Sequence, residues 1–215
     1  VRIDKHIPFE HAALFGCGVV TGVGAVINTA NAREEDSIAV VGLGGVGLSA
    51  LLASMAIGSK KTIAIDLSNE KLKLAHELGA DHILNPNDAN FLERMRDLTS
   101  GGANIAIETA GSGRALKTAY DITRRGGTTV AAGMPGPKVD ITLSHLSIAA
   151  EERIIKGSYM GSCIAHRDIP KYLDMFQTGK LPVDRLLSRK ITFEELNEAM
   201  DRLDDAKTVR EVLIP

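Results

Sequence analysis

Six consecutive residues form a glycine-rich pattern that can bind phosphate groups. They are Gly42, Leu43, Gly44, Gly45, Val46 and Gly47, which match the pattern G-x-G-x-x-G. In this pattern the first glycine permits a tight turn, the second lets the backbone approach a pyrophosphate, and the third lets a helix pack closely on a strand. The N-terminus of the following helix favours the negative charge of the phosphates. The pattern alone is also compatible with a glycine-rich loop that binds no ligand.

A carboxylate follows the glycine pattern at the distance expected for a dinucleotide site. Asp66 lies 19 residues after Gly47, at the end of a second apolar segment. A carboxylate at this place binds the adenosine ribose hydroxyls of NAD and repels the 2′-phosphate of NADP. The combination predicts NAD as the bound cofactor, and a solvated loop acid is the alternative for Asp66.

Cys17, in the segment Gly16-Cys17-Gly18, is the other residue whose type can support chemistry. A catalytic zinc site needs three protein ligands and an open position, and the chain contains neither a C-x-x-C nor an H-E-x-x-H pattern. A lone cysteine is more often a small buried residue. Considered by itself, Cys17 is compatible with both roles, and the buried role is favoured.

Short apolar segments alternate with longer amphipathic ones from about residue 36, and this alternation must position these residues. Strands are expected over residues 38–41, 62–66, 82–84, 104–108, 128–132 and 153–158, and helices over 46–57, 69–78, 88–99 and 112–124, the last with Arg124 and Arg125 at its C-terminus. Repeated βαβ units predict an α/β fold, a doubly wound parallel (Rossmann) sheet of six strands in the order 3-2-1-4-5-6. Thr192 and Glu195 predict a capping box for a later helix that ends near Leu203, and residues 209–213 predict a last strand.

The composition narrows the class of protein. At 215 residues, 44% of them hydrophobic, the chain can bury a full core. A formal net charge of -2 argues against a nucleic-acid partner, and no apolar segment has the length that a membrane span needs. Two cysteines, Cys17 and Cys163, make no disulfide framework, so a reducing, cytoplasmic setting is expected.

Several of these segments together resemble the zinc-dependent, medium-chain alcohol dehydrogenases. The resemblance is carried by Gly16-Cys17-Gly18 with residues 21–24, by the glycine pattern and Asp66, and by Gly79-Ala80, residues 133–135 and 208–210. It implies reversible hydride transfer between NAD and a small alcohol or aldehyde, in a homo-oligomer (a dimer or a tetramer). It also implies that Cys17 is the third protein ligand of a catalytic zinc in the intact enzyme.

The same resemblance implies further cofactor contacts. Thr21 would pack beside the nicotinamide ring, and Lys71 would lie near the adenosine ribose. Residues 132–134 (Ala132, Gly133 and Met134) would meet the nicotinamide and its carboxamide, and Arg210 would reach the pyrophosphate. Lys71 and Arg210 also have a simpler interpretation as solvated surface cations.

The resemblance also divides the chain. Residues 1–18 would be a linker or remnant of a catalytic domain, residues 19–161 the NAD-binding Rossmann domain, and residues 162–215 a segment that returns toward the catalytic domain. The other two zinc ligands and the proton relay are not found in the sequence, so the chain alone is expected to be inactive and essentially free of zinc.

Two other interpretations stay open. A zinc-free quinone or enoyl reductase of the same superfamily would keep the glycine pattern, but it would usually lack Cys17 and prefer NADPH. A non-catalytic NAD-binding module would keep the nucleotide site without any chemistry.

Overall fold

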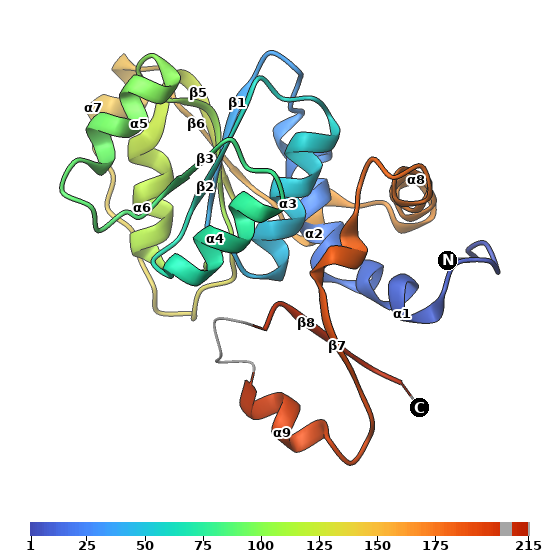
Figure 1. The fold of residues 1–215 in the computed structure, drawn as a ribbon. Helices are drawn as coiled ribbons and strands as arrows, with labels where there is room; N and C mark the ends of the chain where they lie inside the picture. Colours follow the sequence, from blue (N-terminus) through green and yellow to red (C-terminus); the bar gives the residue numbers. More distant parts are fainter. Residues whose placement is uncertain (203–207, 215) are drawn as a thin grey trace.

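In the computed structural model, the apolar segments of the sequence form a parallel sheet of six strands with helices on both sides (Figure 1). The structure describes residues 1–202 and 208–214. The strands are β1 (Ser37–Val41), β2 (Lys61–Ile65), β3 (His82–Leu84), β4 (Ala103–Glu108), β5 (Thr123–Ala131) and β6 (Ile154–Gly157). They lie in the order β3-β2-β1-β4-β5-β6, and each neighbouring pair is parallel, which confirms the predicted doubly wound sheet.

Helices precede the first strand and occupy the segments between the later ones. They are α1 (Phe9–Ala12), α2 (Gly18–Gly24), α3 (Gly45–Ala56), α4 (Asn69–Glu77), α5 (Phe91–Thr99), α6 (Gly113–Ile122), α7 (His145–Ala150), α8 (Ala165–Gln177) and α9 (Leu196–Asp201), with a π-helical segment (Ala25–Ala30) and shorter turns (Ala13–Gly16, Met160–Ser162 and Val183–Leu186). Within the described part of the chain, no single helix is long and apolar enough to cross a membrane. The bent pair Phe9–Gly16 and Gly18–Ala30 has that length and composition only when taken together.

Both faces of the sheet are buried at β1, where successive residues point to opposite sides. In β1, Ile38 and Val40 join the apolar core that also contains the buried residues of α2 and α3. Ala39 and Val41 join a second core with residues of α5 and α6. This double burial explains why β1 is continuously apolar, and it fixes the carboxyl end of β1 between helices on both faces (Figure 1).

Two helix boundaries differ from the prediction by more than one residue. The helix expected over residues 112–124 ends at Ile122, because Thr123 pairs with Ala103 and starts β5. Arg124 and Arg125 therefore lie in a bulged strand segment after the helix, and their predicted placement at the C-terminus of the helix is wrong. The helix expected from residue 88 begins at Phe91, after a turn.

The C-terminal part adds a smaller sheet. Strands β7 (Leu187–Ile191) and β8 (Arg210–Leu213) pair in parallel, on either side of α9 in the sequence. The expected capping pair is half formed: the Thr192 N–H donates to Glu195 Oε2 (2.9 Å), and α9 begins one residue after Glu195. Leu203, where this helix was expected to end, lies outside the described residues.

Candidate functional site

The glycine pattern forms the turn between β1 and α3. Gly42 has a φ of +95°, which residues with a Cβ adopt only at a cost. Its carbonyl oxygen accepts a hydrogen bond from the Thr109 hydroxyl (2.6 Å), and a Cβ added at Gly47 would overlap this same oxygen. The start of α3 therefore packs directly on the end of β1.

Gly44 occupies the N-cap position in an extended conformation, and no side chain among the described residues caps α3. The first N–H groups of α3 are thus suited to an anion.

Arg210 lies over this turn, although it is distant in sequence. Its guanidinium occupies the space beside Gly45 that a Cβ would fill. Its Nη2 atom would lie 2.5 Å from a Cβ added at Gly18, the first residue of α2. Helices α2 and α3 pack so closely that a Cβ at Gly22 would overlap the carbonyl oxygen of Val46. Two helix N-termini and one guanidinium therefore share one small region, which is a strong combination for a pyrophosphate.

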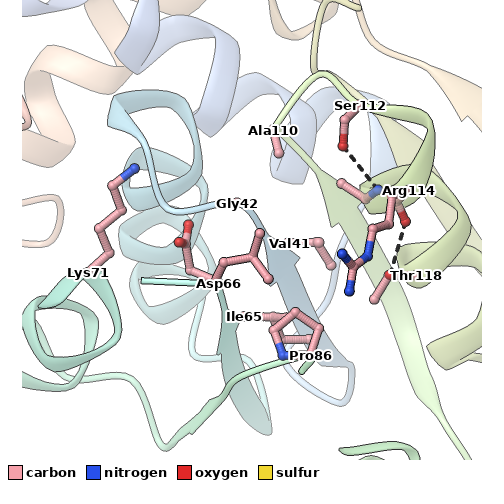
Figure 2. A pocket seen from close by; sticks show the side chains of 12 residues that line it. Val41, Gly42, Ile65, Asp66, Lys71, Pro86, Ala110, Ser112, Arg114 and Thr118 are labelled. Carbon is pink, nitrogen blue, oxygen red and sulfur yellow. Dashed lines mark hydrogen bonds between the residues drawn. The ribbon is translucent and has the colours of Figure 1, made fainter. Parts of the chain in front are cut away.

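Asp66 lies just beyond the carboxyl end of β2 and is held by the backbone. Its Oδ2 accepts a hydrogen bond from the Leu43 N–H (2.7 Å) of the glycine turn, and its Oδ1 accepts one from the Ser68 N–H (2.9 Å). The carboxylate borders a cavity of about 250 Å³ (Figure 2), and Lys71 lines the same cavity. The lining residues are Val41, Gly42, Ile65, Asp66, Leu67, Lys71, Pro86, Ala110, Ser112, Arg114, Ala115 and Thr118.

Part of this lining was missed by sequence reasoning. Arg114 and Thr118 come from α6, Ala110 from the loop after β4, and Pro86 from the residues after β3 (Figure 2). Arg114 Nη2 donates to the Asn87 side-chain oxygen (2.7 Å), which joins two of these segments. The signal that could have found them is the strand order, since β3 and β4 flank the β1–β2 pair and bring their following loops together.

Cys17 is an exposed thiol at the start of α2. Its carbonyl oxygen accepts a hydrogen bond from the buried Thr21 hydroxyl (2.8 Å), which also contacts Met160 Sδ at 3.8 Å. A cavity of about 480 Å³ opens beside it, lined by Ala13, Leu14, Cys17, Gly18, Arg210, Glu211, Val212 and Leu213. An exposed position beside a cavity suits a metal-ligating thiol better than the small buried residue that the local sequence favoured.

The segment after β5 contains the other residues expected at the nicotinamide. The N–H groups of Ala132 and Gly133 both donate to the Glu108 carbonyl oxygen, at 2.9 and 3.0 Å. Met134 is 76% exposed. The Glu108 side chain, which sequence reasoning did not single out, is buried below this segment, and its burial raises its pKa.

The described residues fit a dinucleotide better than they fit a metal. The glycine turn, the cation over it and the carboxylate at the second strand supply binding partners for the pyrophosphate and one ribose of a dinucleotide. In contrast, no group of three His, Cys, Asp or Glu side chains that could hold a metal occurs within residues 1–202 and 208–214. Cys17 supplies one thiolate where a zinc site needs at least three protein ligands, so the other ligands would have to come from outside this set.

Comparisons with known proteins agree with this arrangement. The family model described as zinc-binding dehydrogenase matches residues 45–178. Geraniol dehydrogenase of Castellaniella defragrans is 33% identical over 215 residues, and the class-2 alcohol dehydrogenase isozyme 2 of Oryctolagus cuniculus is 34% identical over 219 residues. They match 100% and 99% of this chain, which spans 57% and 56% of their own lengths.

A solved structure is equally similar. Benzyl alcohol dehydrogenase of Acinetobacter calcoaceticus superposes with a TM-score of 0.95 at 31% identity, over 99% of this chain and 59% of its own. The resemblance inferred from the glycine pattern, Asp66 and Cys17 is thereby confirmed. The chain belongs to the zinc-binding dehydrogenase family.

Proposed function

We propose that the chain is the NAD-binding part of an alcohol dehydrogenase, which transfers hydride reversibly between an alcohol and NAD. The proposal includes a catalytic zinc for which Cys17 supplies one ligand, while the remaining ligands lie outside the chain. The alcohol dehydrogenases among its relatives support the reaction type. The chain alone would then bind the nucleotide without catalysing the reaction.

The observation that carries the proposal is the position of Arg210. Its guanidinium lies against Gly45 in the glycine turn, and the same residue lines the cavity beside Cys17. A pyrophosphate at Arg210 would leave one arm of the dinucleotide to extend toward Asp66 and the other toward Cys17 and Thr21. The thiol and the nicotinamide would thus share one cleft, as hydride transfer next to a metal requires.

Asp66 supports NAD rather than NADP. Its carboxylate is held by two backbone N–H groups at the rim of the cavity, where the adenosine ribose would bind. A 2′-phosphate at this place would meet the negative charge at close range, which disfavours it. Lys71 lines the same cavity and would contact the ribose from the other side.

The division of labour in the reaction follows from these positions. When bound, zinc supplies a Lewis acid that makes the alcohol hydroxyl more acidic. Cys17 would hold this ion, the N–H groups at the start of α3 and Arg210 would bind the pyrophosphate, and residues 132–134 and Thr21 would orient the nicotinamide. The protein thereby contributes position and electrostatics, whereas the cofactor accepts the hydride.

An exposed sheet edge supports self-association. Strand β6 ends the six-stranded sheet, and its Ile154 and Ile155 are 45% and 40% exposed. An unpaired apolar edge strand is a surface that another strand can extend. We therefore include a homo-oligomer, formed across this edge, in the proposal.

The test uses the gene product that contains this chain. Cys17→Ser should abolish stoichiometric zinc in elemental analysis and alcohol-dependent formation of NADH, while NADH affinity stays within about twofold because the thiol is separate from the nucleotide contacts. Cys163→Ser is the matched control and should change none of these quantities. If Cys17→Ser kept full activity, the zinc role would be refuted and a zinc-free reductase favoured. If the wild type bound NADH but did not oxidise alcohols, a non-catalytic module would be favoured.

A further inference from the structure

Glu108 is a buried acid at the centre of the sheet. It is the last residue of β4, between β1 and β5, and it is only 2% exposed. A buried carboxylate is costly unless several donors satisfy it. It also lies at the carboxyl end of a central strand, which is the edge of the sheet where ligands bind in this fold.

The donors come from the backbone of the loop that follows. Glu108 Oε1 accepts a hydrogen bond from the Gly111 N–H at 2.6 Å. The N–H groups of Ala110, Ser112 and Gly133 also lower the pKa of the carboxyl by hydrogen bonding, although burial has the larger effect and raises it. The carboxylate therefore lies inside a turn of N–H groups contributed mainly by residues 110–112.

Two glycines allow this close arrangement. Gly111 has a φ of +69°, and a Cβ added there would lie 2.8 Å from the carbonyl oxygen of Met134. A Cβ added at Gly133 would lie 2.7 Å from Glu108 Oε1 and would overlap the Gly111 nitrogen. The carboxylate is thus sandwiched between the loop after β4 and the segment after β5.

The loop held in this way forms part of the wall of the cavity in which the proposed function places the adenosine. Ala110 and Ser112, on either side of Gly111, line the cavity that Asp66 borders (Figure 2). The other anchor of the loop is Thr109, whose N–H donates to the Val41 carbonyl oxygen at 2.9 Å. Thr109 fixes the beginning of the loop, and Glu108 fixes its apex.

We propose that Glu108 is a positioning residue whose carboxylate sets the shape of loop 109–112, and through it the affinity for the adenosine half of the dinucleotide. The proposal rests on the proposed NAD function. It differs from a purely structural role because the donors that surround the carboxyl group belong to a loop that lines the cavity.

The test replaces the carboxylate by its amide. In Glu108→Gln the amide oxygen can still accept from Gly111, but the amide nitrogen places a donor against the remaining N–H groups. We expect the affinity for ADP-ribose and for NADH to fall by the same factor, about tenfold, because ADP-ribose contains every part of NAD that the loop would touch. The free energy of unfolding should stay close to that of the wild type, because the amide has nearly the same size and its oxygen still accepts from the Gly111 N–H.

The control and the contrary results separate this inference from the proposed function. Glu93→Gln, on the exposed surface of α5, should leave both affinities and the stability unchanged. ADP-ribose binding to Glu108→Gln with wild-type affinity would refute the positioning role, as would an affinity loss that accompanies a matching loss of stability. If the wild-type chain binds neither ADP-ribose nor NADH, the proposed function is wrong and the inference falls with it.

Discussion

Asp168 gives a quantitative prediction about what stabilises the C-terminal part of the chain. Its side chain is 3% exposed and accepts hydrogen bonds from Arg167 Nε (2.6 Å), the Ile164 N–H (2.7 Å) and Asn28 Nδ2 (3.2 Å). These contacts, and the Arg167 contact above all, lower the pKa of the carboxyl from 3.8 to about 2. The group therefore ties α8 to the π-helical segment that follows α2.

The shift converts into stability with a definite sign. Because the folded-state pKa is below the unfolded value, the ionised carboxylate stabilises the fold at every pH above 3.8, and the contribution is lost as the pH falls toward about 2. At about 1.4 kcal/mol for each pKa unit, the contribution at neutral pH is roughly 2 kcal/mol. Asp168→Asn should lower the free energy of unfolding by this amount at neutral pH, and the difference from wild type should shrink at pH about 3.

Urea denaturation at the two pH values measures both quantities. Asp174→Asn, an exposed position on the same helix, is the matched control and should change the stability by less than about 0.5 kcal/mol. The reasoning would be refuted if Asp168→Asn were as stable as this control, or if its deficit persisted undiminished at the lower pH.

Three further changes test other parts of the structure. Gly47→Ala places a Cβ on the Gly42 carbonyl oxygen, so it should cost about 1–3 kcal/mol in urea denaturation and abolish measurable NADH binding. Arg210→Gln removes the cation over the glycine turn. It should weaken the binding of NADH about tenfold and flatten the salt dependence of binding in titration calorimetry. An unchanged affinity would mean that Arg210 does not bind the pyrophosphate. Met95→Ala empties a fully buried position in the core on the α5 side of the sheet; it should cost about 2–5 kcal/mol of stability with NADH affinity retained, and a proportional loss of affinity would mean that the site depends on global stability.

The parts of the fold that follow local rules were predictable from the sequence. The first strand, the glycine turn and Asp66 depend on residues close together in the chain, where periodicity and glycine spacing carry the information. The strand order followed from the right-handed connection rule once six strands were recognised. In contrast, the end of α6 was predicted too late, because Thr123 pairs with Ala103 in a bulged register that no local pattern reveals.

The site was predictable only in part, for the same reason. Cys17, Arg210 and residues 132–134 came from resemblance to a family, since nothing local indicates that Arg210 returns to the glycine turn. Arg114 and Pro86 were missed because a cavity is formed by segments that are distant in sequence. Glu108 was missed because a strand-ending acid is ordinary until burial and the surrounding N–H groups are known.

Calorimetric titration of the chain with NADH and with NADPH tests the central claim most directly. The arrangement of the glycine turn, Arg210 and Asp66 predicts that NADH binds and that NADPH binds at least about tenfold more weakly, since its 2′-phosphate would meet the Asp66 carboxylate. Equal or tighter binding of NADPH would contradict the assigned role of Asp66. Binding of neither nucleotide would contradict the assignment of the dinucleotide site itself.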